Sequence, residues 1–259
     1  MRRGRSRRNR SLNHNCNRNC NCNHNQDHDY SRSRSRSRNG SQQPETCCMS
    51  DARVREKLCL LGRSLFERGL THGRTGNISV RTDRGFLMTP TGASLGGLDP
   101  ARLSLLDGDG AHVGGDVPTK EALLHLAMYR ARSGDGAVLH LHSGHAVAVS
   151  VLADVDPANA IPPLTAYQAM RVGTLPLLPY FAPGDPALAG IVGVAARKHH
   201  ALLLSNHGPI VSGSTLVVAA DVVEELEATA RLWLQVRHEP VRCLTPGQLT
   251  ELAERYPRN

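Results

Sequence analysis

The chain has 259 residues and a formal net charge of +8 at pH 7. Residues 1–48 contain 11 Arg, no Lys and three acids, so the excess charge lies in this segment and the remainder is neutral. The folded part therefore gives no reason to expect nucleic acid as a partner. No apolar run reaches the ~18 residues of a membrane span, and the N-terminus lacks the apolar segment of a secretory signal.

Cysteine usage divides the chain in the same way as charge. Five of the seven cysteines lie within residues 1–48, which leaves Cys59 and Cys243 in the rest of the chain. Two cysteines in a segment of this size do not form a disulfide framework, so we expect a reducing compartment and a cytoplasmic protein.

Residues 1–48 have low complexity, with Asn at every second position from 13 to 25 and Ser-Arg repeats over 31–38. They have almost no apolar side chains to offset the entropy of ordering, so we expect a disordered tail. Its cysteines and histidines would suit zinc, and its Ser-Arg run would suit RNA. The strict alternation also resembles translated repetitive DNA upstream of a start at Met49, the interpretation we favour. Residues 49–259 are then expected to form a single folded domain.

The remainder alternates predicted helices with short predicted strands. The predicted strands are Asn77–Arg81, Phe86–Met88, Ala137–His142 and Ala201–Ser205. The predicted helices are Asp51–Gly69, Pro118–Arg132, Ser143–Ala153, Pro186–His200 and a last helix with an apolar stripe from Leu216 to Trp233. Thr119 is the expected N-cap of the second helix. The irregular alternation predicts a layered α/β domain with a mixed sheet.

The strand Ala137–His142 carries the first candidate for chemistry. Its residues alternate faces, so His140 and His142 stand side by side and both can reach one metal ion. Two ordinary histidines on a wet strand face would show the same spacing. A third imidazole, His207, follows an apolar strand and completes the three nitrogen ligands typical of a catalytic zinc site.

Glu121 is the candidate acid/base group, and it lies near the start of the predicted helix Pro118–Arg132. A glutamate there is also explained by the helix dipole, which it stabilises by ~0.3–1 kcal/mol. Helix N–H groups together with Lys120 favour an anion at this end. Two glycine loops, Gly76-Asn77 and Thr91-Gly92, offer further donors for a phosphate.

Five segments occur in the order found in the class II aldolase/adducin family, which this chain resembles over about residues 52–250. The matching segments are Gly73–Arg81, Met88–Gly92, Pro118–Glu121, His140–His142 and Asn206–Gly208. The resemblance implies a single-domain layered α/β/α fold with a mixed, mostly antiparallel central sheet.

The resemblance also implies roles for individual residues. His140, His142 and His207 are expected to hold one Zn²⁺ per subunit, with Glu121 as the catalytic residue and a further metal contact; manganese or cobalt would also suit the site. The expected cradle for a substrate phosphate is Gly76, Asn77, Thr91, Gly92, Thr119 and Lys120. Family members are usually homotetramers with sites at subunit contacts, so a neighbouring chain is expected to lend a residue such as Tyr167 or Tyr180.

The pair Thr119-Lys120 replaces the Ser-Ser common in family aldolases. With the segments 164–167 and 179–185, it resembles the family branch that decarboxylates 3-oxo-tetronate 4-phosphate to dihydroxyacetone phosphate and carbon dioxide. The expected path is a zinc-bound enediolate to which Glu121, with its pKa raised by its surroundings, delivers a proton.

Other activities remain open at this point. An aldolase of the fuculose-phosphate type would form the same enediolate, and epimerase or dehydratase activity also fits the residues. A non-enzymatic adducin-like module is less consistent with three metal-spaced histidines and a glutamate. Membrane and nucleic-acid partners are not expected for the folded part.

Overall fold

A mixed sheet forms the centre of the described structure. The computed structural model describes residues 51–257, so the predictions made for residues 1–48 lie outside the described residues. Within this range, eight strands follow the order β4-β3-β2-β1-β5-β8-β7-β6. Neighbouring strands are antiparallel except for β6 and β7. The strands are β1 Asn77–Thr82, β2 Gly85–Met88, β3 Ser104–Leu106, β4 His112–Gly114, β5 Ala137–His140, β6 Leu177–Leu178, β7 Ala201–Leu204 and β8 Gly208–Gly213.

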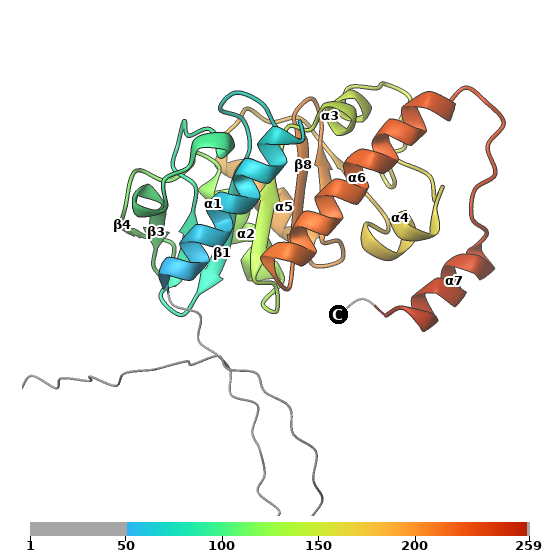
Figure 1. The fold of residues 1–259 in the computed structure, drawn as a ribbon. Coiled ribbons are helices and arrows are strands. Elements are labelled where there is room, and N and C mark those ends of the chain that lie inside the picture. The colour runs from blue at the N-terminus through green and yellow to red at the C-terminus, as the bar shows by residue number, and fades with distance from the viewer. Residues whose placement is uncertain (1–50, 258–259) are drawn as a thin grey trace, which may run out of the picture. The chain divides into compact units, whose positions relative to one another are not determined.

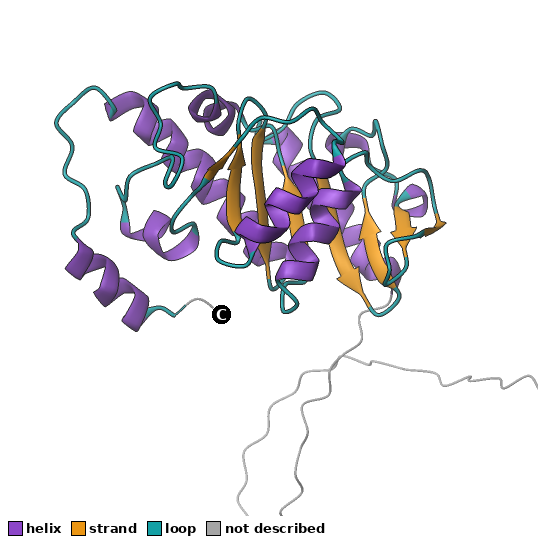
Figure 2. Ribbon diagram, turned by 180° about the vertical axis from the view of Figure 1, so that it is seen from behind, coloured by secondary structure: helices purple, strands orange, loops and turns teal. Residues whose placement is uncertain are grey.

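Helices cover both faces of the sheet. The α-helices are α1 Asp51–Glu67, α2 Ala122–Ala131, α3 Gly144–Ser150, α4 Ala166–Arg171, α5 Pro186–Ala196, α6 Leu216–Val236 and α7 Pro246–Arg255. Two short 3-10 turns, Leu95–Gly97 and Pro100–Arg102, join β2 to β3. Helices α1 and α6 cross the face seen in Figure 1, and α2 and α5 lie together on the opposite face, seen in Figure 2.

Two separate apolar layers hold these helices to the sheet. On one face, α1 and α6 bury residues such as Leu58 and Leu226 against the strands. On the other, α2 and α5 do the same with residues such as Met128 and Leu188. Strand β5, at the middle of the sheet, contributes alternate residues to both layers, as its period of two requires. The predicted layered α/β/α fold with a mixed, mostly antiparallel sheet is confirmed.

Several element boundaries differ from the predictions. The helix expected over Pro118–Arg132 begins only at Ala122, so Thr119 is not its N-cap. The histidine strand ends at His140, which places His142 in the segment beyond it. The short helix α4 and the C-terminal helix α7 were not predicted. No helix within residues 51–257 combines the length and apolarity needed to cross a bilayer.

Candidate metal centre

His140 ends β5, the strand that lies between β1 and β8 in the sheet, and the residue is completely buried. Its Nδ1 donates to the carbonyl of Pro209 at 2.8 Å. A carbonyl only accepts, so the proton lies on Nδ1 and Nε2 keeps its lone pair. This hydrogen bond fixes both the tautomer and the direction of a metal-ligating nitrogen.

His142 and His207 bring their Nε2 atoms to the same point. Each lies 3.2 Å from the Nε2 of His140. His207 lies in the turn between β7 and β8, where Asn206 takes a positive φ of 55°. The turn is therefore tight enough to aim His207 back over the end of β5, and the three histidines predicted from the sequence are brought together.

These distances suit a metal ion. Because Nε2 of His140 carries a lone pair and no proton, it cannot donate a hydrogen bond to the other two nitrogens. In a tetrahedral zinc site with Zn–N bonds of 2.0–2.1 Å, two ligand nitrogens lie about 3.3 Å apart. The Nε2 atoms and a carboxylate oxygen of Glu121 all lie within 4.8 Å of one another. The donor set therefore fits one divalent cation with nitrogen ligands.

Glu121 is the N-cap residue of α2, but its side chain does not cap the helix. Instead, Oε1 lies 3.1 Å from Nε2 of His207, and Oε2 lies 3.4 Å from Nε2 of His140. Oε2 also accepts a hydrogen bond from Nδ2 of Asn77 at 2.8 Å. Among the described residues, Oε1 is buried and has no hydrogen-bond partner. One carboxylate oxygen is therefore held, and the other remains available for chemistry.

Electrostatics keep the imidazoles of His140 and His142 neutral and the glutamate ionised. Burial, with the neighbouring His140 and His207, lowers the pKa of His142 to about 3, and burial also lowers that of His140. Neutral imidazoles are the form that binds a metal. Burial alone would raise the pKa of Glu121, but the His140 and His207 imidazoles and the Asn77 amide lower it overall. The expected raised pKa of Glu121 is therefore wrong for the ligand-free protein.

The three loops expected to hold a phosphate lie at the same end of the sheet as the histidines. Asn77 pairs with His140 in the register of β1 and β5. The backbone N–H of Thr119 donates to Thr89, which joins the loop before α2 to the loop after β2. Gly76 has a φ of +78°, and a Cβ there would lie 3.0 Å from the carbonyl oxygen of His140.

The predicted cradle residues are not all equally accessible. Lys120 is exposed, whereas Asn77 is 5% exposed and its amide already binds Glu121. Thr119 is also buried, and its hydroxyl accepts from the backbone N–H of Glu121 at 3.3 Å. Thr91 and Gly92 line a cavity of about 370 Å³.

The sequence reasoning missed two residues near this site. Arg74 lines the same cavity as Thr91 and Gly92 and would add a guanidinium to the cradle. Its signal was its position between Gly73 and Gly76 in a loop already singled out. The other missed residue is His125, one turn after Glu121 on α2, which is hydrogen-bonded to Asn77.

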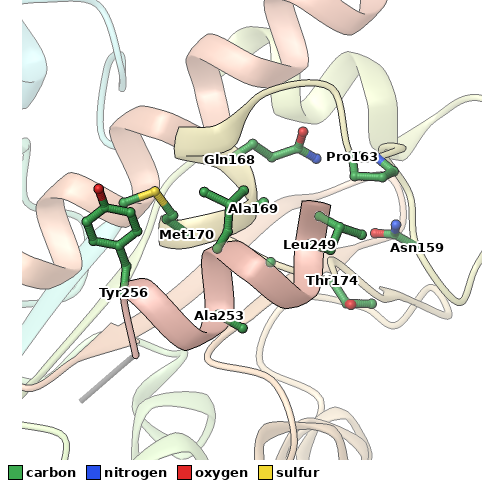
Figure 3. A pocket seen from close by; sticks show the side chains of 11 residues that line it. Asn159, Pro163, Gln168, Ala169, Met170, Thr174, Leu249, Ala253 and Tyr256 are labelled. Atoms are coloured by element: carbon green, nitrogen blue, oxygen red, sulfur yellow. The ribbon is translucent and has the colours of Figure 1, made fainter. Parts of the chain in front are cut away.

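A second cavity, of about 440 Å³, lies between α4 and α7, and its lining includes none of the four cluster residues. Figure 3 shows Ala169 and Met170 of α4 facing Leu249 and Tyr256 across it. It is separate from the chemistry described above.

The fold and the converging histidines and glutamate define a metal-dependent α/β enzyme. Residues 56–234 match the family described as the class II aldolase and adducin N-terminal domain, and the chain belongs to this family. The family predicted from the sequence is confirmed.

Within this family, the chain is similar to proteins named 3-oxo-tetronate 4-phosphate decarboxylase. It is 47% identical over 208 residues to that of Haemophilus influenzae, covering 80% of this chain and 99% of the relative. It is 45% identical over 200 residues to that of Escherichia coli K12, covering 77% of this chain and 94% of the relative. The predicted resemblance to the decarboxylase branch is confirmed.

Solved structures agree with this placement. The crystal structure of YgbL from Klebsiella pneumoniae is similar with a TM-score of 0.77 and 42% identity, covering 79% of this chain and 99% of that chain. An L-fuculose 1-phosphate aldolase is more distant, with a TM-score of 0.73 and 26% identity over 81% of this chain and 99% of that chain.

Proposed function

We propose that this chain is a metal-dependent carbon–carbon lyase that decarboxylates 3-oxo-tetronate 4-phosphate to dihydroxyacetone phosphate and carbon dioxide. The observation that carries the proposal is the convergence of three imidazole nitrogens and one carboxylate at a single point. The names of the relatives at 42–47% identity supply the substrate.

His140, His142 and His207 would hold the cation, with Glu121 beside it. A bound divalent cation supplies Lewis-acid polarisation of the substrate's oxygen atoms. We assign zinc, because three nitrogen ligands with an open position are typical of catalytic zinc sites.

Glu121 supplies the proton. In the proposed reaction, the bond between C1 and C2 breaks, carbon dioxide leaves, and C2 takes up a proton to become the terminal CH₂OH. An anionic substrate beside Glu121 raises the pKa of that carboxyl, because like charges disfavour ionisation. Glu121 is therefore ionised in the free protein and takes up the proton that it later delivers when substrate is bound.

The loops around Gly76, Thr91 and Lys120 would anchor the phosphate at C4. Lys120 is exposed and brings an ammonium, and Arg74 in the neighbouring cavity brings a guanidinium. Binding energy from this remote group orients the reacting carbons at Glu121. The proposed phosphate residues remain Gly76, Asn77, Thr91, Gly92, Thr119 and Lys120, with Asn77 acting chiefly through Glu121.

We further propose a cytoplasmic homotetramer in which a neighbouring chain lends Tyr167 or Tyr180 to the site. The two residues are 60% and 62% exposed, as that role requires. Light scattering after size-exclusion chromatography measures the oligomer directly, and a monomer would contradict the arrangement.

The test uses purified, metal-loaded protein with two substrates. With 3-oxo-tetronate 4-phosphate we expect carbon dioxide and dihydroxyacetone phosphate in equal amounts, and with a ketose 1-phosphate no cleavage. The reverse result would establish an aldolase, an alternative supported by 33% identity to an L-fuculose phosphate aldolase of Escherichia coli K12.

A further inference from the structure

A file, or row, of four buried polar side chains leads from Glu121 away from the three histidines of the metal site, between β1 and α2. It consists of Asn77 (5% exposed), His125 (0%), Ser79 (0%) and Tyr129 (2%). Asn77 binds Glu121 and His125, His125 binds Ser79 at 2.7 Å, and Ser79 binds Tyr129 at 2.9 Å. Polar groups this deeply buried cost free energy unless they are paired, and here each is paired.

The hydrogen bonds of this file have one direction. Glu121 is a carboxylate and only accepts, so Asn77 must turn its NH₂ toward Oε2. The amide oxygen of Asn77 then faces His125 and accepts, so the proton of that ring lies on Nε2. Nδ1 of His125 is left to accept from the Ser79 hydroxyl, whose oxygen accepts from Tyr129.

We propose that His125 is a positioning residue that locks the amide of Asn77 and thereby holds Oε2 of Glu121 unprotonated, so that the catalytic proton is carried on Oε1. A proton on Oε2 would meet the NH₂ of Asn77. Turning that amide over would place its NH₂ against the N–H of His125, unless the His125 ring and the hydroxyls of Ser79 and Tyr129 all reversed their hydrogen bonds with it. Oε1 has no hydrogen-bond partner among the described residues and lies 3.1 Å from Nε2 of His207. The inference rests on the proposed function, because it assigns the atom that delivers the proton.

The variants separate hydrogen-bond direction from packing. His125→Leu fills the volume but removes both hydrogen bonds, so the Asn77 amide is free to turn. His125→Gln can still donate to Asn77 with its NH₂ and accept from Ser79 with its oxygen. The histidine ligands are unchanged in both variants, so we expect both to retain metal in the amount found in the parent protein by inductively coupled plasma mass spectrometry.

For His125→Leu we expect kcat to fall by about tenfold or more with KM within about twofold. The free Asn77 amide no longer holds its hydrogen bond to Glu121, which is a bond to a charged group at the reacting atoms. His125→Gln should recover to within about threefold of the parent protein. A crystal structure of His125→Leu should show the Asn77 amide or the Glu121 carboxylate turned from its position in the parent. Unchanged kcat in His125→Leu, or equal losses in both variants, would overturn the proposal.

A milder pair covers the case in which His125→Leu does not fold. Ser79→Ala removes the donor to Nδ1 of His125, so that the ring is no longer held in one tautomer. Its matched control is Ser212→Ala, because Ser212 is equally buried and hydrogen-bonded to Asp135. We expect a lower kcat for Ser79→Ala and a parental kcat for Ser212→Ala, and indistinguishable kcat values would overturn the proposal.

The crystallographic test of His125 does not depend on the substrate assignment. A parent protein that releases no carbon dioxide from 3-oxo-tetronate 4-phosphate defeats the proposed function. The positions of Asn77 and Glu121 in crystals of the His125 variants would still decide whether His125 holds the carboxylate.

Discussion

Glu121→Gln tests whether this side chain works as an acid or only as a ligand. The glutamine oxygen can accept from Asn77 as Oε2 does, at 2.8 Å. Its NH₂ then points to the Nε2 atom of His207, which lies 3.1 Å from Oε1 in the parent protein. The fold therefore loses only the difference between a charged and a neutral acceptor, about 1 kcal/mol.

The loss in catalysis should be much larger. Removal of a positioned general acid lowers kcat by roughly 10²–10⁴-fold, which corresponds to about 3–5 kcal/mol of transition-state stabilisation. Three histidines remain, so metal content should stay near the parental value. The assay is carbon dioxide release at saturating substrate, with metal analysis and urea unfolding on the same preparation. A variant with full metal and a kcat within a few-fold of the parent would refute the acid role of Glu121.

Three further predictions concern the metal, a glycine and acid. His142→Ala should abolish metal retention after dialysis, and unchanged metal content would show that this histidine is not a ligand. Gly76→Ala should lower the free energy of unfolding by about 1–3 kcal/mol, measured by urea titration, since φ is +78° and the new Cβ would lie 3.0 Å from the His140 carbonyl oxygen. Burial lowers the pKa of His125 from 6.5 to about 3, so in metal-free protein the free energy of unfolding should fall as pH falls from 6.5 toward 3. The lowered pKa of Glu121 acts with the same sign, but only below its ordinary value of 4.5. An unfolding midpoint constant between pH 7 and pH 4 would therefore contradict the assignment for His125.

The sequence predicted the layers of the fold because apolar periodicity and turn residues are local signals. The first helix, the hairpin of β1 and β2, and the apolar stripe of α6 all appear where the pattern placed them. The start of α2 did not, although Pro118-Thr119 fits a capping pattern. The backbone of Thr119 donates to Thr89, and Pro118 pairs with Pro90 across the loops. This pairing holds the chain extended and delays the helix to Ala122.

Helix α7 was missed although its local signal was present. Thr245 and Gln248 form a capping box, with Pro246 at the first position of the helix. The helix also has an apolar face, with Leu249, Leu252, Ala253 and Tyr256 three or four residues apart, but none of its residues is buried because this face lines the cavity against α4. The capping residues and the apolar spacing both indicate a helix at this position.

The metal ligands were predictable because His140 and His142 have the spacing of residues on one strand face, and His207 directly follows an apolar strand. Their convergence depends on β5 and β8 being neighbours, which brings Pro209 and His207 to His140. The direction of the Glu121 pKa shift was not predictable. It depends on which polar atoms face the carboxylate, and those atoms come from three different elements.

The partners of Glu121 are nevertheless recorded in the sequence as two periodicities. Asn77 and Ser79 are two apart on β1, so they share a face, while Glu121, His125 and Tyr129 are four apart on successive turns of α2. Neither pattern is a motif by itself, because an N-x-S in a strand or a glutamate, histidine and tyrosine along a helix has many ordinary explanations. The packing of α2 on the sheet face makes the two patterns meet, since each helix turn then lies opposite a strand residue of matching hydrogen-bond character. A polar strand period facing a polar helix period next to a metal-ligand motif is therefore a signal for residues that orient a catalytic group, and it can be sought in sequences where neither half would stand out.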